Sequence, residues 1–339
     1  MDTQRILVTG GAGYIGSHCV VELLAHGHDV AVIDNLSNSS ARSLERVSEI
    51  AGRSVPLFRS DLLDTVAVRE LLVTRPFDAV IHFAGLKAVG ESLEQPLRYY
   101  HNNVSGTISL LEAMQAVGLK RLVFSSSCTV YGTPEQLPIT EEMARNGENP
   151  YARTKMMIED ILGSLAESDP EWRIANLRYF NPVGAHQSGV IGEDPRGRPN
   201  NLMPFLMQVA AGRYDHLRVF GNDYPTPDGT CIRDYVHVCD LATAHLAALE
   251  ALESIDGFDA FNLGTGTGHS VLDVIRAAEQ AVGRPIPYEI APRRQGDAAA
   301  SYANPAKAER QLGWAATRQL PEMCGDHWRW QRDHPHGYD

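Results

Sequence analysis

A tyrosine and a lysine lie four residues apart in a segment whose pattern predicts an amphipathic helix. Met157, Ile158 and Ile161 supply the apolar positions after Tyr151 and Lys155. The i, i+4 spacing places the phenol and the ammonium on one helix face. Because a nearby positive charge favours phenolate, we expect Lys155 to lower the pKa of Tyr151. Such a pair is suited to moving a proton to or from a substrate hydroxyl near neutral pH.

A run of hydroxyl side chains ends the apolar strand that precedes this helix. Ser125, Ser126 and Ser127 are followed by Cys128 and Thr129. Ligands of open α/β sheets bind at the carboxyl ends of parallel strands, where these hydroxyls are expected to lie. The alternative is that they satisfy only local backbone groups at the strand terminus.

A glycine-rich turn predicts a phosphate site near the start of the chain. Residues 9–16 read TGGAGYIG, between the first predicted strand and the first predicted helix. Glycines allow a tight turn and a close approach to a pyrophosphate, whose charge the helix N-terminus then stabilises. Asp34, 18 residues after Gly16, can accept hydrogen bonds from ribose hydroxyls and repels a 2′-phosphate. We therefore expect an NAD site rather than a plain structural turn.

The elements that must position these residues alternate along the first half of the chain. Apolar runs predict strands at 5–8, 29–33, 55–58, 79–82, 121–125 and 173–179. Helical spacing falls between them, at 14–27, 41–51, 65–74, 99–118 and 151–165. This alternation predicts an α/β protein with a doubly wound parallel sheet, the Rossmann fold.

The texture changes after residue 180. Residues 181–230 are rich in Gly, Pro and Asn, which is typical of long binding loops attached to a rigid sheet. Regular patterns return at 235–252 and 258–263. We expect an NAD-binding domain over residues 1–180, re-entered by about 235–265. A smaller α/β domain over 181–339 would bind the substrate.

Composition narrows the class of protein. The 339 residues are 43% hydrophobic and carry a net charge of −12, which argues against nucleic-acid or anionic-membrane partners. Five scattered cysteines without a CxxC pair predict reduced thiols, and Cys231, His237 and Cys239 lack a fourth metal ligand. With no signal peptide and no run long enough to span a bilayer, we expect a cytoplasmic protein without a metal.

The glycine loop and the Tyr/Lys pair together resemble the extended short-chain dehydrogenase/reductase family. In that family the tyrosine is the acid/base, the lysine lowers its pKa and holds the nicotinamide ribose, and a serine orients the substrate hydroxyl. The resemblance assigns these catalytic roles to Tyr151, Lys155 and Ser127.

Further motifs resemble one branch of that family, the UDP-glucose 4-epimerases, from Arg5 to the end of the chain. They are IHFAGLKAVGES at 81–92, YYHNNV at 99–104, RYFNPVGAH at 178–186, NNLMP at 200–204, FGNDYP at 220–225 and RDY at 233–235. The resemblance implies an NAD-dependent isomerase that epimerises UDP-hexoses at C4 through a transient 4-keto sugar and enzyme-bound NAD. It also suggests a homodimer, packed through helices 99–118 and 151–165.

The resemblance places two sets of residues around the ligands. The cofactor set is Gly10, Gly13, Tyr14, Ile15, Gly16, Asp34, Asn35, Asn38, Ser39, Asp61, Leu62, Phe83, Ala84, Gly85, Lys87, Asn102, Ser125, Tyr151, Lys155 and Tyr179. The UDP-sugar set is Ser127, Tyr151, Asn181, Asn201, Leu202, Phe220, Arg233, Arg294, Asp297 and Ser301. Arginine suits this second set because its guanidinium binds phosphate oxygens through paired hydrogen bonds.

One departure from the family pattern concerns substrate range. Where members confined to non-acetylated sugars have a bulky tyrosine, this chain has Ser301, followed by Tyr302. We therefore expect UDP-GlcNAc and UDP-GalNAc to be substrates as well, although a one-residue register slip would restore the bulky group.

Two alternative functions are weighed against an epimerase. A 4,6-dehydratase needs an acidic pair beside the active-site hydroxyl, but Cys128 and Thr129 follow Ser127. A non-catalytic NAD sensor on the same fold would be expected to have lost the Tyr/Lys pair, which is intact here.

Overall fold

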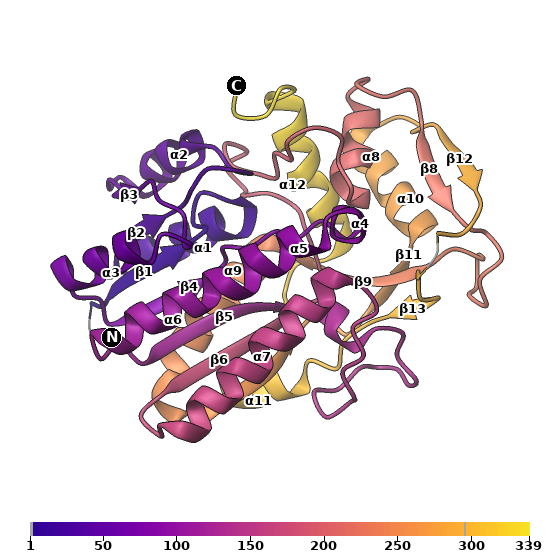
Figure 1. The fold of residues 1–339 in the computed structure, drawn as a ribbon. Helices are drawn as coiled ribbons and strands as arrows, with labels where there is room; N and C mark the ends of the chain where they lie inside the picture. Colours follow the sequence, from indigo (N-terminus) through magenta and orange to yellow (C-terminus); the bar gives the residue numbers. More distant parts are fainter. Residues whose placement is uncertain (1–2, 295) are drawn as a thin grey trace.

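A seven-stranded parallel sheet forms the centre of the computed structural model, which describes residues 3–294 and 296–339 (Figure 1). Its order is β10-β6-β5-β4-β1-β2-β3, and each neighbouring pair of strands is parallel. The strands are β1 (Arg5–Thr9), β2 (Asp29–Ile33), β3 (Leu57–Phe58), β4 (Ala79–His82), β5 (Arg121–Ser127), β6 (Arg173–Tyr179) and β10 (Gly257–Leu263). The predicted doubly wound α/β fold is confirmed.

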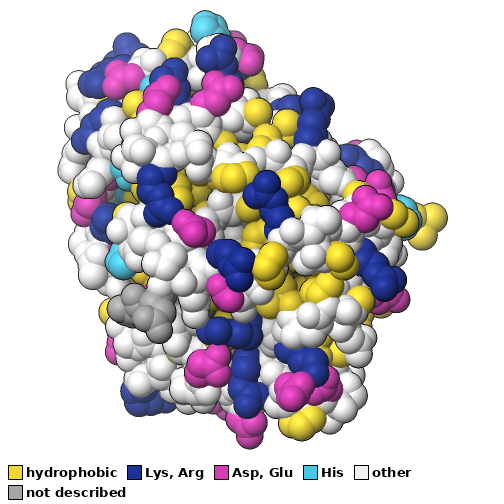
Figure 2. All heavy atoms as spheres, turned by 90° about the vertical axis from the view of Figure 1, so that its left-hand side faces the viewer, with side chains coloured by type: hydrophobic (Ala, Val, Ile, Leu, Met, Phe, Trp, Pro, Cys, Tyr) yellow, Lys and Arg dark blue, Asp and Glu magenta, His cyan; other side chains and the backbone are white. Residues whose placement is uncertain are grey.

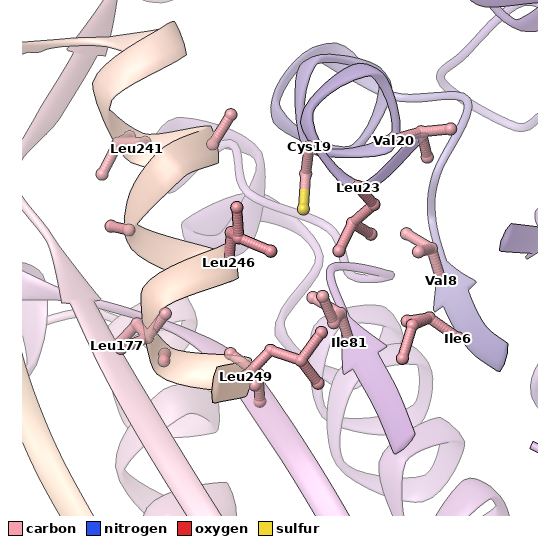
Figure 3. Packing of buried hydrophobic residues seen from close by; sticks show 14 of the residues in the cluster. Ile6, Val8, Cys19, Val20, Leu23, Ile81, Leu177, Leu241, Leu246 and Leu249 are labelled. Carbon is pink, nitrogen blue, oxygen red and sulfur yellow. The ribbon is translucent and has the colours of Figure 1, made fainter. Parts of the chain in front are cut away.

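Helices cover both faces of this sheet (Figure 1). One face carries α1 (Tyr14–Ala25), α2 (Ala41–Ala51) and α9 (Val238–Ala251), whereas the other carries α3 (Thr65–Thr74), α6 (Gly106–Ala116) and α7 (Pro150–Ser168). Side chains alternate along a strand. Ile6 and Val8 of β1 therefore enter the core on the face with α1, α2 and α9, while Leu7 enters the core on the face with α3, α6 and α7. Figure 3 shows Ile6 and Val8 facing Leu23 of α1, with Leu249 of α9 close by.

The predicted helix over 99–118 is not one continuous α-helix. The chain forms α4 (Val89–Glu94), α5 (Pro96–Tyr99), a π-helical turn η1 (Tyr100–Ser105) and then α6. Within η1, the Asn103 side chain accepts a hydrogen bond from Leu86 N (2.8 Å) and donates to Leu86 O (3.0 Å) and Thr154 Oγ1 (3.1 Å). The irregular turn thus ties the loop after β4 to α7, and such turns are frequent at functional sites.

A smaller α/β part contains two further sheets. The first holds β7 (Asn181–Val183), β9 (Ile232–His237), β11 (Gly268–Ser270) and β13 (Ala300–Ser301), and the second pairs β8 (Leu217–Phe220) with β12 (Tyr288–Ala291). Their core includes side chains of α8 (Leu202–Ala210), α10 (Val271–Val282) and α12 (Leu320–Asp333). The chain returns to the large sheet through α9 and β10, and later adds α11 (Ala306–Leu312) to it. Short 3-10 turns, η2 (Cys128–Tyr131) and η3 (Leu252–Ser254), complete the elements.

The surface charge and the length and hydropathy of the helices bear on nucleic-acid and membrane partners. In Figure 2, basic and acidic side chains are intermixed over the face shown, so this face has no broad basic patch. In the described part of the chain, no helix is both long and apolar enough to cross a membrane.

Candidate active site

A cavity of about 710 Å³ opens where the parallel strands meet the smaller part of the chain. Its walls come from the ends of β1, β2, β4, β5 and β6, from the start of α7, from loops and elements between residues 180 and 297, and from Tyr338. Both predicted ligand sets line it, with one exception: within the described residues, Ser301 is not part of the lining. The two sets are therefore brought together in a single space.

The glycine loop is shaped so that only glycine fits at two positions. Gly10 has φ +68°, and a Cβ there would lie 2.7 Å from Ala84 N. A Cβ on Gly16 would lie 2.4 Å from Gly10 O. The backbone therefore packs closely enough to bring the start of α1 to the cavity.

The N-terminus of α1 is open for an anion. Its N-cap is Gly13, no described side chain caps it, and Tyr14, Ile15 and Gly16 line the cavity. Uncapped N–H groups and the helix dipole favour a negatively charged ligand there. Asp34, at the end of β2, accepts hydrogen bonds from Ala12 N (3.0 Å) and the Ser39 hydroxyl (2.9 Å). The residues present fit the diphosphate and ribose of a dinucleotide.

Tyr151, Lys155 and Ser127 line the same cavity. Pro150 begins α7, and the Asn149 side chain caps it by accepting a hydrogen bond from Ala152 N (2.9 Å). Tyr151 thus lies in the first turn of α7, and Lys155 lies one turn further. Ser127 ends β5, where its hydroxyl oxygen accepts from Thr129 N (3.2 Å) and the Thr129 hydroxyl (2.9 Å).

Burial is the largest influence on the pKa of Tyr151. Burial raises the pKa of Tyr151 to about 12, while a hydrogen bond with Ser127 opposes this rise. The Lys155 ammonium instead donates to Ser125 O (2.5 Å) and lies 4.7 Å from the centre of the Phe124 ring. Desolvation of the phenolate therefore dominates the pKa of Tyr151, and a lowering by Lys155 stays a prediction.

Burial also shifts the pKa of the lysine. It lowers the pKa of Lys155 to about 8, while the negative charge of Glu159 opposes the shift. Glu159 is itself buried, one helical turn after Lys155, and Arg178 holds it in an ion pair (2.7 Å). Sequence reasoning missed Glu159, although the i, i+4 spacing from Lys155 was a usable signal.

A second missed carboxylate joins the two parts of the chain. Glu193 lines the cavity, is buried, and pairs with Lys87 Nζ at 2.9 Å. Lys87 follows β4, whereas Glu193 lies more than a hundred positions later. No local motif connects these residues, so their meeting could not be read from the sequence.

Another side of the cavity gathers two arginines around one carboxylate. Arg294 Nε donates to Asp297 Oδ2 (2.9 Å), and an Arg233 nitrogen lies 3.9 Å from the same carboxylate. The Arg294 guanidinium also lies 4.8 Å from the centre of the Phe220 ring. The group offers cations for phosphate oxygens and a flat apolar ring for a base.

Ser301 lies just outside this group. It belongs to β13 and is the register partner of Arg233 in β9. The Tyr302 ring packs instead near Gly268, within 3.2 Å of where a Cβ would stand. Neither Ser301 nor Tyr302 is among the described residues that line the cavity.

The described residues contain no group of three or more His, Cys, Asp or Glu side chains arranged to hold a metal ion. The five cysteines, all within the described ranges, are free.

The parallel sheet, the open glycine loop and the Ser-Tyr-Lys trio define a protein of the extended short-chain dehydrogenase/reductase class. Within that class, the chain belongs to the NAD dependent epimerase/dehydratase family, whose model matches residues 6–264. The resemblance seen in the sequence is confirmed.

The similar proteins include several UDP-glucose 4-epimerases. The chain is 58% identical over 335 residues to the UDP-glucose 4-epimerase of Bacillus subtilis (strain 168), covering 99% of each chain. A UDP-glucose 4-epimerase structure from Bifidobacterium longum, in complex with NAD+ and UDP, has a TM-score of 0.95 and 50% identity, covering 98% of this chain and 99% of that one. One from Stenotrophomonas maltophila, with bound NAD and formylated UDP-arabinopyranose, has a TM-score of 0.96 and 49% identity over the same shares.

Proposed function

We propose that this chain is an NAD-dependent isomerase that reversibly interconverts UDP-glucose and UDP-galactose by inverting C4. The observation that carries the proposal is the single cavity in which an open dinucleotide cradle, a Ser-Tyr-Lys trio and two arginines meet. The relatives described above support the same reaction. We assign residues 1–180 with about 235–265 to NAD binding, and the remainder of 181–339 to the UDP-sugar.

NAD would be held by the cofactor residues predicted from sequence. The start of α1 would bind the diphosphate, and Asp34 would bind a ribose. Lys155, Ser125 and Tyr179 line the same cavity farther along the NAD site. When bound, NAD supplies the hydride acceptor and donor for C4, together with a positive charge in its oxidised form.

Tyr151 accepts the proton of the sugar 4-hydroxyl as C4 is oxidised and returns it as C4 is reduced on the other face. Ser127 orients that hydroxyl. Burial raises the pKa of Tyr151 and so favours its protonated form, which means that proton uptake depends on positive charge near the phenol to populate the phenolate. Lys155 contributes such a charge in the same dry region. The reaction leaves no net redox change.

The arginines anchor the substrate while the sugar turns. Arg233 and Arg294 bind the diphosphate, Phe220, Asn201 and Leu202 surround the nucleotide, and Asn181 lies nearer the sugar. Anchoring through UDP leaves the 4-keto sugar free to present its second face. The arginines can do this on an acidic protein because phosphate recognition is local.

The substrate range extends to UDP-GlcNAc and UDP-GalNAc. The support is the small Ser301 side chain, which pairs in register with the cavity-lining Arg233 although it does not itself line the cavity, and the Tyr302 ring, which packs near Gly268 outside the lining. We expect Ser301→Tyr to preserve UDP-galactose turnover within about threefold and to abolish UDP-GalNAc turnover, because the ring adds bulk beside Arg233. Chromatography of both sugar pairs measures the change. A wild-type protein that converts UDP-galactose well but never UDP-GalNAc rejects the wider range.

The chain forms a homodimer in the cytoplasm. Exposed apolar side chains on neighbouring helices α4 to α7 support the dimer: Val89, Leu93, Leu97, Ile108 and Met157. The free cysteines agree with a reducing compartment. Sedimentation of the purified protein at micromolar concentration should give twice the chain mass of 37.2 kDa.

Turnover separates the proposed function from its alternatives. Purified protein incubated with UDP-galactose should produce UDP-glucose with no net consumption of NAD. A 4,6-dehydratase would release a dehydrated keto sugar, and a sensor would bind NAD without producing either compound.

A further inference from the structure

One wall of the cavity is a segment that reaches across to the large sheet. We call residues 192–198 the clasp segment; Gly192, Glu193, Asp194, Pro195 and Arg198 line the cavity. Glu193 pairs with Lys87 Nζ (2.9 Å), after β4, and Arg196 donates to Ser39 O (2.8 Å), after β2. The segment therefore touches the Rossmann part at two points on the cavity rim.

The last residues of the chain hold this segment from behind. We call residues 334–339, which follow α12, the C-terminal tail (Figure 1). The Tyr338 hydroxyl donates to Gly192 O and accepts from Gly192 N, both at 3.2 Å. Tyr338 N also donates to Asp194 Oδ2 (3.1 Å). Tyr338 itself lines the cavity.

The tail fits the clasp segment closely. Gly337 has φ +76°, and a Cβ there would lie 2.1 Å from an Asp194 carboxylate oxygen. The Trp330 ring lies 4.8 Å from the Tyr338 ring, and its Nε1 donates to Glu193 O (3.1 Å). The tail and the end of α12 thus constrain three successive residues of the segment, 192–194.

We propose that the C-terminal tail is a latch for the dinucleotide, with Tyr338 as its positioning residue. By holding the clasp segment against Lys87 and Ser39, the tail slows dissociation of a ligand that fills the cavity between them. This inference rests on the proposed NAD site. Its effect lies in the release rate, because a ligand leaves only after the contacts across the rim open.

The test measures NAD release from the holoenzyme. Tyr338→Phe removes the hydroxyl and keeps the ring, so loss of two hydrogen bonds should speed NAD release about five- to thirtyfold. Gly337→Ala pushes on Asp194 and should act in the same direction. The matched controls are Tyr288→Phe, an exposed tyrosine of β12, and Gly283→Ala, which has φ +79° and open space around it. Both controls should release NAD at the wild-type rate.

The release rate is followed by exchange of bound NAD against an excess of isotopically labelled NAD, and the melting temperature is measured on NAD-free protein. A merely structural tail would lower the melting temperature of Tyr338→Phe and leave its release rate unchanged, which overturns the proposal. Should Gly337→Ala fail to fold, Tyr338→Phe alone decides. If wild-type protein binds no NAD, the proposed function falls first and the latch with it. If NAD binds but release is unchanged in Tyr338→Phe, only the latch falls.

Discussion

The charged groups at two ends of the cavity differ in exposure, and we call the end with Tyr151 and Lys155 the dry end and the end with Arg233 and Arg294 the wet end. Lys155 is 5% exposed, whereas the side chains of Arg233 and Arg294 are 20% and 54% exposed. Burial shifts the pKa values of Lys155 and Tyr151, whereas salt screens the field of a more exposed guanidinium. We infer that proton transfer depends on the dry end, and that capture of the anionic substrate depends on the wet end.

Tyr151→Phe should cause the largest loss. The ring and its packing remain, but no hydroxyl is left to accept the proton, so kcat should fall about 10²- to 10⁴-fold. Bound NAD should be retained, because the cradle around α1 is untouched. Steady-state kinetics with UDP-galactose and a count of NAD per chain test both parts. Undiminished epimerisation would remove Tyr151 from the acid/base role.

Lys155→Met should reveal the free-energy penalty of a buried charge. The pKa of Lys155 is about 8 in the fold and is higher in the unfolded chain, so folding disfavours its charged form. The penalty is therefore fully present below pH 8 and is relieved as pH rises through 8 toward the unfolded value. At pH 7 the NAD-free variant should be more stable than wild type by up to about 3 kcal/mol.

Urea unfolding of both proteins at pH 7 and pH 9.5 measures this penalty. The difference in unfolding free energy between variant and wild type should shrink at the higher pH, because other groups titrate alike in the two proteins. A difference that stays constant with pH would show that Lys155 carries no such penalty.

Arg294→Ala should have a smaller effect, confined to the wet end. Losing one charged hydrogen-bonding partner of the diphosphate should raise KM for UDP-galactose about 10- to 100-fold, with kcat nearly unchanged. Added salt should raise the wild-type KM more than that of the variant. Arg276→Ala is the control, since Arg276 forms a similarly exposed i, i+3 ion pair, with Asp273, on α10. A fall in kcat with unchanged KM would contradict a capture role.

The dry end was largely predictable from sequence because its signals are local. The glycine loop, Asp34 and the Tyr/Lys pair each lie within or next to one element, and parallel topology brings strand ends to one edge of the sheet. The direction of the Tyr151 pKa shift was not predictable, because it depends on burial of the side chain in the tertiary structure. The π-helical turn η1 was also missed, since the apolar spacing of Val104, Ile108 and Leu111 starts within this turn and runs on into α6.

The wet end and the clasp segment were harder to predict from the sequence, because they form through contacts between distant parts of the chain. Resemblance to a family placed Arg233 and Arg294 in the site, but spacing alone could not. Glu193 and Tyr338 lie in segments without a recognisable motif, and only the fold brings them to the cavity rim. Ser301 is the opposite case, a residue that the family resemblance placed in the site. In the structure it lies beside Arg233 but is not among the described residues that line the cavity.

If C4 is inverted through enzyme-bound NAD, the hydrogen removed from C4 is held within the enzyme and returned to the same carbon. Conversion of UDP-galactose deuterated at C4, in ordinary water, tests this claim directly by mass spectrometry and NMR of the product. We expect UDP-glucose that keeps deuterium at C4, with no net accumulation of reduced NAD. Product that carries solvent hydrogen at C4, or stoichiometric reduction of NAD, would contradict it.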